Sequence, residues 1–252
     1  MSRYFIDAAH IVDSHIEITG EDAGHILRVL RYEPGDSIIL CDGAGLDYPA
    51  VIIETGKDRL IARLGDGYPS KGEPDAKVVL YQGIPKSSKM DIIIQKCVEL
   101  GIHSIIPLNT SRTVVNLSEA KKIHKRVERW QKIAREAAKQ SNRGMIPQIG
   151  FPVDFSDLVT SAAHPIKLIP WEGEVNLGLK CYFDKHKNDI YKEDRTEIGV
   201  IIGPEGGLSY EEIDLAKKCG WVIVTLGPRI LRTETAGIAA LAVIMSYMGE
   251  ME

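Results

Sequence analysis

The segment LGPRILRTETAG, residues 226–237, places two arginines and a glutamate between two apolar stretches. Arg229, Arg232 and Glu234 stand within six residues of one another, with Thr233 among them. Charged side chains between buried elements are unfavourable unless they pair or face a ligand. The spacing allows two interpretations. One is a ligand site, and the other is a helix start in which Thr233 is the N-cap and Arg232 pairs with Glu234.

A second loop, GPEGG at residues 203–207, has the composition of a backbone cradle for a ligand. Ser209 and Glu212 follow it with the spacing of a capping box, which predicts the start of a helix. The glycines bring backbone amides close to a ligand, or else Gly206 and Gly207 only form the turn. The loop has no GK[ST], which excludes a P-loop. No GxGxxG follows the first strand of the α/β part, so a Rossmann dinucleotide site has no support.

Both loops follow short, β-branched runs that are typical of buried parallel strands. The two strands are predicted at 198–203 and 221–227. Further strands are predicted at 77–84, 103–108 and 167–171, and helices at 88–101, 118–140 and 234–249. Strands that alternate with helices predict a parallel sheet covered on both faces. Such sheets bind ligands at the carboxyl ends of their strands, where the two loops are expected to lie. The charged stretch 173–197 is predicted to be a loop or insertion.

Residues 1–70 are predicted to form a separate β-rich unit, a barrel or a sandwich, because short apolar runs recur between Gly, Asp and Pro. One helix, residues 21–31, interrupts the strands and carries Arg28 and Arg31 on one face. This unit holds 6 Lys and Arg against 12 Asp and Glu, so that face is its only candidate surface for a phosphate backbone. The second unit is predicted over residues 76–252.

The predicted helix over residues 118–140 has a strongly basic face. Its apolar residues fall at helical spacing and predict a core-facing side, which leaves lysines and arginines such as Arg129 exposed. These residues form a candidate phosphate-binding surface, which Arg143 extends into the next loop. The alternative is a solvated helix with ion pairs such as Glu128 with Lys132.

The composition excludes several classes of protein. The chain has 252 residues, of which 44% are apolar, and a net charge of -4, which by itself does not indicate nucleic-acid binding. Its four cysteines lie far apart without a CxxC pair, which argues against a zinc ribbon and favours reduced thiols in the cytosol. The N-terminal residues have no apolar signal region, and the longest apolar run, 236–245, is too short to span a bilayer. We therefore expect a cytoplasmic protein without a membrane segment.

Five motifs occur in a fixed order along the chain: HILRVLR, IPKSSKMDIIIQKCVELGI, ERWQKIAREAAKQSNR, IGPEGGLS and LGPRILRTETA. Together they resemble the ribosomal RNA small subunit methyltransferase E family, a branch of the SPOUT methyltransferases. The resemblance covers nearly the whole chain, and its last motif is specific. It implies a PUA-like β-barrel at the N-terminus and a C-terminal α/β domain with a parallel sheet and a deep trefoil knot. General topology rules would not predict such a knot.

The resemblance also implies an activity and partners. S-adenosylmethionine (SAM) would donate a methyl group to N3 of one uridine in 16S rRNA of the small ribosomal subunit, without a metal, and the protein would be a homodimer. The last helix, 234–249, is apolar nearly all round, which is typical of burial in a large core or against a second subunit. Two alternatives are a non-catalytic RNA-binding or ribosome-assembly factor and a SPOUT enzyme that modifies tRNA.

The family's motifs carry its site residues onto this sequence. In the family, backbone groups of the knot loops hold SAM, and the matching positions are Ile169, Pro170, Ile202, Gly203, Pro204, Glu205, Gly206, Leu226, Gly227, Ile230, Leu231 and Thr233. The candidates for contact with RNA are Arg28, Arg31, Lys86, Lys89, Arg129 and Arg143.

Uridine N3 carries a proton and becomes a good nucleophile only when that proton leaves. The site therefore needs a proton acceptor and a group that stabilises the imide anion. Arg232 and Arg229 suit the second task. Glu205, Glu234 and Glu172, or a water molecule, are candidates for the first, and the sequence does not decide among them. N3 lies on the pairing edge of the base, so the uridine must be unpaired or flipped during the reaction.

Overall fold

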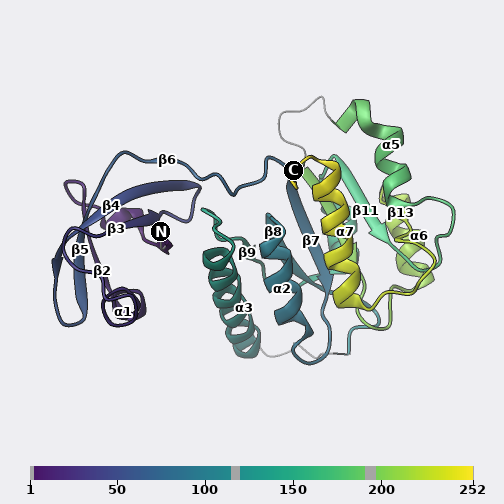
Figure 1. Ribbon diagram of the computed structural model, residues 1–252. Helices are drawn as coiled ribbons and strands as arrows, with labels where there is room; N and C mark the ends of the chain where they lie inside the picture. The colour runs from purple at the N-terminus through teal and green to yellow at the C-terminus, as the bar shows by residue number, and fades with distance from the viewer. Residues whose placement is uncertain (1–2, 115–119, 191–196, 252) are drawn as a thin grey trace. The chain divides into compact units, whose positions relative to one another are not determined.

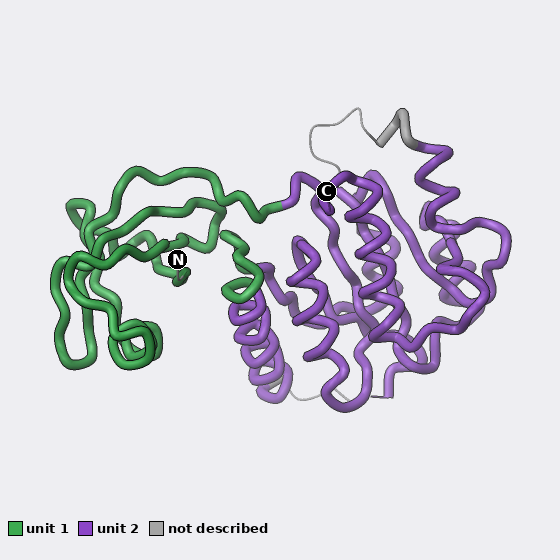
Figure 2. The backbone as a smooth tube through the Cα atoms, in the orientation of Figure 1, with its two compact units in different colours: residues 1–73, 138–146 green, residues 74–137, 147–252 purple. Residues whose placement is uncertain are grey.

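The computed structural model describes residues 3–114, 120–190 and 197–251, and it divides the chain into two compact units (Figure 2). Unit 1 comprises residues 1–73 and 138–146, and unit 2 comprises residues 74–137 and 147–252. The sequence did not predict that the segment 138–146 belongs with unit 1. One reason for its place is that the buried Arg143 pairs with Glu73 at an N–O distance of 2.7 Å.

Unit 1 contains a six-stranded sheet, which confirms the predicted β-rich unit. Its elements are β1 (Arg3–Phe5), η1 (Ala8–His10), β2 (His15–Thr19), β3 (Ser37–Cys41), β4 (Leu46–Thr55), β5 (Arg59–Leu64) and β6 (Tyr68–Pro69). The spatial order is β1-β3-β4-β5-β2, with β6 paired to β4. No pair between β1 and β2 closes a barrel among the described residues, so the sheet is a half-barrel. In β2 the buried Ile16 and Ile18 alternate with exposed residues, which gives the sheet one core face.

The helical segment of unit 1 is shorter than the sequence predicts. The helix expected over residues 21–31 consists of α1 (Gly20–Gly24) and a π-helical turn, η2 (His25–Val29). Arg28 lies in η2, whereas Arg31 lies beyond it, with a φ of 57° in the left-handed region. The prediction that Arg28 and Arg31 share a helical face is therefore wrong, because the helix ends before Arg31.

Unit 2 contains a seven-stranded sheet in which every pair is parallel, as predicted for an α/β fold. Its strands are β7 (Lys77–Gly83), β8 (Ser104–Asn109), β9 (Gln148–Ile149), β10 (Val153–Asp154), β11 (Ile166–Pro170), β12 (Glu197–Ile202) and β13 (Val222–Val224). The order is β10-β8-β7-β12-β11-β13, with β9 paired to β8. β11 precedes β12 and β13 in the chain yet lies between them, in the stretch where the family resemblance implies the knot.

Helices cover both faces of this sheet (Figure 1). They are α2 (Lys89–Glu99), α3 (Ala120–Gln140), α4 (Phe155–Ser161), α5 (Leu179–Ile190), α6 (Tyr210–Lys218) and α7 (Thr233–Tyr247). Successive residues of a strand point to opposite faces, so Leu80 of β7 packs near α7, whereas Val79 and Tyr81 share a core cluster with α4 and α6. None of the described helices combines the length and the apolar character needed to cross a bilayer.

The stretch 173–197 was predicted to be a loop or insertion, and here the prediction is wrong for α5 (Leu179–Ile190). Leu179, Tyr182 and Phe183 are buried, and the Phe183 ring stacks on Tyr247 of α7 with ring centroids 5.2 Å apart. These apolar residues have the spacing of a helix face, but the stretch around them is rich in charged residues. Residues 191–196 of the stretch lie outside the described residues.

Candidate active site

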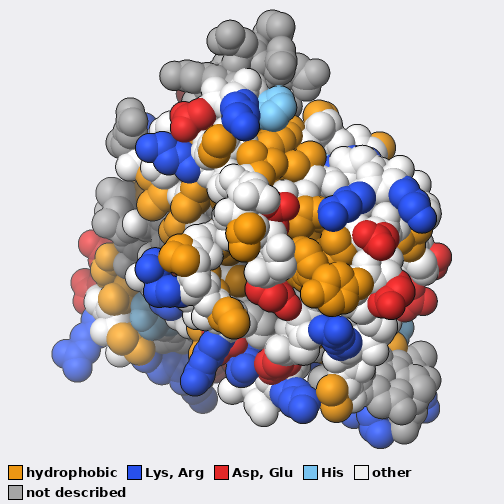
Figure 3. Space-filling model, turned by 90° about the vertical axis from the view of Figure 1, so that its right-hand side faces the viewer, with side chains coloured by type: hydrophobic (Ala, Val, Ile, Leu, Met, Phe, Trp, Pro, Cys, Tyr) orange, Lys and Arg blue, Asp and Glu red, His pale blue; other side chains and the backbone are white. Residues whose placement is uncertain are grey.

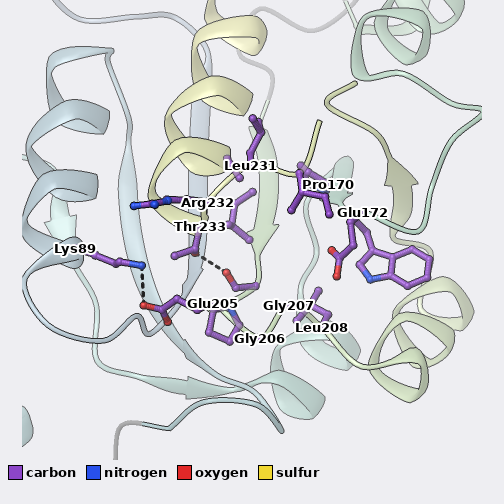
Figure 4. Close-up of a pocket in the computed structure, with 16 residues that line it drawn as sticks. Lys89, Pro170, Glu172, Glu205, Gly206, Gly207, Leu208, Leu231, Arg232 and Thr233 are labelled. Carbon is purple, nitrogen blue, oxygen red and sulfur yellow. Dashed lines mark hydrogen bonds and ion pairs between the residues drawn. The ribbon is translucent and has the colours of Figure 1, made fainter. Parts of the chain in front are cut away.

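The two loops that the sequence singles out follow β12 and β13 in unit 2, and together with the end of β11 they line a cavity of about 340 Å³ (Figure 4). Its walls are Lys89, Pro170, Trp171, Glu172, Ile202, Gly203, Pro204, Glu205, Gly206, Gly207, Leu208, Ile230, Leu231, Arg232, Thr233 and Ala236. A smaller cavity of about 80 Å³ shares part of this wall and adds Thr225, Leu226, Gly227 and Arg229. The volume of the larger cavity is within the range of small-molecule sites.

Almost every residue expected to hold the cofactor lines one of these two cavities. The exception is Ile169, which was expected to form a further wall. It is completely buried and packs in the core cluster with α4 and α6. Its neighbour Pro170 does line the cavity, because adjacent strand residues point in opposite directions.

Thr233 connects the two loops to the central strand. Its Oγ1 donates a hydrogen bond to the carbonyl oxygen of Gly203 at 2.6 Å and accepts one from Nε2 of Gln82 at 2.9 Å. The sequence allowed Thr233 to be the N-cap of the last helix, but the structure places Arg232 at that position, without a side-chain capping bond. Thr233, itself the first residue of α7, instead links β7 to the loop that follows β12 and lines the cavity.

Two glycines allow the backbone to pass close to the cavity. A Cβ added to Gly203 would lie 3.0 Å from the backbone carbon of Gly207, which is tighter than ordinary van der Waals contact. Gly227 has a φ of 109°, a conformation that other residues rarely adopt. Side chains at these positions would therefore disturb the loops that form the walls.

Lys89 lies between two carboxylates at one side of the cavity (Figure 4). Its Nζ is 3.1 Å from Oε1 of Glu205 and 3.4 Å from Oε2 of Glu234. The hydrogen bond to Glu205 and the nearby charges raise the pKa of Lys89. Burial alone would raise the pKa of Glu205. Backbone N–H donors, including that of Lys86 at 3.0 Å, and the Lys89 ammonium have a larger effect, so the pKa of Glu205 is lowered overall. Glu205 therefore stands as an anion beside the ammonium group of Lys89.

The sequence allowed an ion pair between Arg232 and Glu234, and this interpretation is wrong. Glu234 pairs with Lys89, and within the described part of the chain no carboxylate pairs with Arg232. Arg232 is exposed and lines the larger cavity, while the exposed Arg229 lines the smaller one. The Arg232 guanidinium thus has free donors at the cavity.

Several polar groups around the cavity have unused hydrogen-bonding capacity. Gln82 Oε1, Trp171 Nε1 and Glu234 Oε2 are buried without a hydrogen-bond partner, although Glu234 Oε2 lies 3.4 Å from the Lys89 ammonium. Glu172 makes no hydrogen bond or ion pair with any described residue, and its carboxylate points into the cavity toward Gly207 (Figure 4). Unsatisfied buried groups are unfavourable, so their presence fits a site that takes a polar ligand.

The residues proposed to contact RNA have different surroundings. Lys86 is exposed, and Arg28 is exposed with only a loose pair to the equally exposed Asp58 at 3.6 Å. Arg129 of α3 makes a two-pronged ion pair with Asp91 of α2, with N–O distances of 2.6 and 2.8 Å. An arginine held in this way contributes less free charge to the surface than the sequence suggests.

Arg143 was expected on an exposed loop, and the structure corrects this expectation. The residue is only 4% exposed and donates to Glu73 at 2.7 Å. Glu73 also accepts the backbone N–H groups of Gly144 and Met145. Arg143 therefore stabilises the fold of unit 1, because its charge is used within a buried network.

Two residues at the site were missed in the sequence. Gln82, the second-last residue of β7, donates to Thr233, and Arg112 donates to the carbonyl oxygen of Gly206 at 2.7 Å, which fixes the GPEGG loop. Both lie far from the two loops in the chain, and no local motif points to them. Within the described residues, no group of three or more His, Cys, Asp and Glu side chains is arranged to hold a metal ion.

Comparison with known proteins defines first the class and then the family. Residues 72–245 match the RNA methyltransferase domain, and residues 18–65 match the RNA methyltransferase PUA domain. The chain is 36% identical to the Ribosomal RNA small subunit methyltransferase E of Bacillus subtilis over 258 residues, covering 100% of this chain and 98% of that protein. The protein is thus an RNA methyltransferase with a PUA domain. It belongs to the ribosomal RNA small subunit methyltransferase E family.

Solved structures agree with this assignment. The Ribosomal RNA small subunit methyltransferase E of Neisseria gonorrhoeae, bound to S-adenosyl methionine, is 29% identical, covers 98% of this chain and 97% of its own, and has a TM-score of 0.81. A putative methyltransferase from Legionella pneumophila, in complex with SAM, is 31% identical, covers 97% and 96% of the two chains, and has a TM-score of 0.78. The expected family and the SPOUT fold are therefore confirmed.

Proposed function

We propose that this protein transfers the methyl group of SAM to N3 of one uridine in 16S rRNA. The family membership and the two SAM-bound relatives support the cofactor and the substrate. The observation that carries the proposal is the cavity itself, which is lined by both family motifs and has an arginine with free donors at its edge.

The residues of the cavity suit SAM. Backbone groups of the GPEGG and 226–231 loops, with Pro170 and Leu231 as apolar walls, would hold the nucleoside. When bound, SAM supplies a methyl group made electrophilic by its positive sulfonium. The unpaired carboxylate of Glu172 lies on the side shared by the two cavities and would accept hydrogen bonds from the donor groups of the cofactor.

The charged side of the cavity suits the uridine. Loss of the N3 proton leaves negative charge on the flanking carbonyl oxygens, which Arg232, assisted by Arg229, would stabilise. The proton acceptor is one of the carboxylates Glu172, Glu205 and Glu234 or a water molecule. Arg28, Arg31 and the lysines near the cavity would bind the RNA backbone and present an unpaired or flipped base.

The proposal includes a cytoplasmic homodimer, in line with the location of ribosomal RNA. Support for a subunit contact comes from α7, whose Val243 is 37% exposed while Ile238 and Ala242 of the same helix are partly exposed. Apolar side chains on one side of a helix that also packs on its own sheet are typical of an interface.

The experiment is to incubate the protein with methyl-labelled SAM and small ribosomal subunits from a strain that lacks this activity, and then to map the modified base by mass spectrometry. We expect one labelled uridine in 16S rRNA, with the methyl group on N3. Label in tRNA alone would identify a tRNA enzyme instead. Binding to the subunit without consumption of SAM would identify a non-catalytic assembly factor.

A further inference from the structure

Lys89 occupies an unusual position for a lysine. It is the first residue of α2, where the positive end of the helix dipole disfavours a cation, and the N-cap residue Ser88 makes no capping bond. Its ammonium turns to the cavity and meets Glu205 and Glu234, which come from two other segments of the chain. The position is explained by these two carboxylates rather than by the helix.

The arrangement determines which cation Glu234 binds. Glu234 is two positions from Arg232, at the start of α7, and the two side chains could pair with each other. In the structure Lys89 pairs with both Glu234 and Glu205. Figure 4 shows that the ends of the Lys89, Arg232 and Glu205 side chains lie on the same side of the cavity. The backbone N–H of Lys86 also holds Glu205, so this carboxylate has two partners.

We propose that Lys89 is a positioning residue that keeps Arg232 available for the uridine by holding Glu205 and Glu234 away from it. The inference rests on the proposed function, in which Arg232 stabilises the imide anion. Without the ammonium, two carboxylates and one guanidinium remain at this side of the cavity, and the guanidinium attracts either carboxylate. A guanidinium paired to a carboxylate has fewer donors and less net charge to offer a developing oxyanion.

The first test replaces the lysine alone. Lys89→Met is expected to lower the kcat of methyl transfer to small subunits roughly ten- to a hundredfold, because a weakened oxyanion donor has effects of this order. The Kd for SAM, measured by calorimetry, is expected to stay within about twofold, because the cofactor walls are untouched. Lys89→Arg keeps a cation between the carboxylates and should retain most of the activity.

Lys96→Met, which breaks the partly exposed pair with Glu99 on the same helix, is the matched control and should behave as wild type.

The second test separates this role from a merely structural one. Glu234→Gln alone sets the reference rate, because Glu234 is also a candidate proton acceptor. In the Glu234→Gln background the carboxylate beside Arg232 has no charge, so Lys89→Met should lower kcat by a factor at least several-fold smaller than in the wild-type background. Thermal melting of each variant verifies folding. A Lys89→Met enzyme with wild-type kcat, or an equal loss of kcat from Lys89→Met in the wild-type and Glu234→Gln backgrounds, would overturn the inference. Failure of the proposed function itself would be distinct, since the wild-type protein would then methylate no uridine.

Discussion

Arg232 is the residue on which the proposed chemistry depends. It is exposed, lines the larger cavity and has no carboxylate partner among the described residues, although Glu234 is only two positions away. A guanidinium with free donors can hydrogen-bond to both a carbonyl oxygen and a developing anion. If the guanidinium instead pairs with a carboxylate, fewer of its N–H donors are left for the substrate. The availability of Arg232 is therefore set by Lys89, a residue of another helix.

Arg232→Ala tests this role directly. Removal of one oxyanion donor is expected to lower kcat by about 10²- to 10³-fold, whereas the affinity for SAM should change little. Single-turnover methylation of small subunits and calorimetry with SAM measure the two quantities. Arg232→Lys, which keeps the charge but loses the planar fork, should retain an intermediate rate. Wild-type turnover by Arg232→Ala would show that the imide anion is stabilised by another group.

At the scale of elements, local sequence signals were most reliable where the partner atoms are close in the chain. The capping box of α6 is present, with Ser209 Oγ accepting from the N–H of Glu212 at 3.2 Å and Glu212 accepting from the N–H of Ser209 at 2.8 Å. Gly101 ends α2 with a φ of 92°, as expected for a helix C-terminus. By contrast, α5 was missed, because the charged residues around its apolar face dominate the composition of the stretch.

Phe183→Ala tests the packing of α5. The side chain is completely buried against α7, so its removal is expected to cost about 3–5 kcal/mol of unfolding free energy. Denaturant unfolding followed by tryptophan fluorescence measures the change. Lys180→Ala, at an exposed position of the same helix, should stay within about 0.5 kcal/mol of wild type. Equal stability of the two variants would mean that α5 is not packed on the core.

At the scale of the whole molecule, RNA recognition does not follow from net charge. The chain carries a formal charge of -4, and on the face shown in Figure 3 acidic and basic side chains are interspersed. Arg129 and Arg143 are engaged in ion pairs within their own units, whereas Arg28 and Arg31 are exposed in unit 1. We therefore expect a few particular cations, rather than a uniform basic field, to bind the phosphates.

The double variant Arg28→Glu with Arg31→Glu tests the RNA contact of unit 1. Its affinity for a 16S rRNA fragment, measured by fluorescence anisotropy, should fall and depend less steeply on salt, because phosphate contacts release counterions. The affinity for SAM should not change, because the cavity lies entirely within unit 2. Arg63→Glu is an exposed control in unit 1 that reverses the charge elsewhere. An unchanged RNA affinity would show that Arg28 and Arg31 are solvated surface residues that do not contact the RNA.

Patterns within short stretches of the chain were sufficient to predict the parallel α/β sheet, the β-rich unit, the α6 cap and the two loops of the cavity. The groups that specify these features are neighbours in the sequence. The order of the family motifs along the chain was sufficient to identify the enzyme family. Only the tertiary structure decided that Glu234 pairs with Lys89, that Arg143 is buried and that Gln82 supports Thr233. The reason is physical: the alternative partners of a charged or polar side chain differ little in free energy, and long-range packing selects among them.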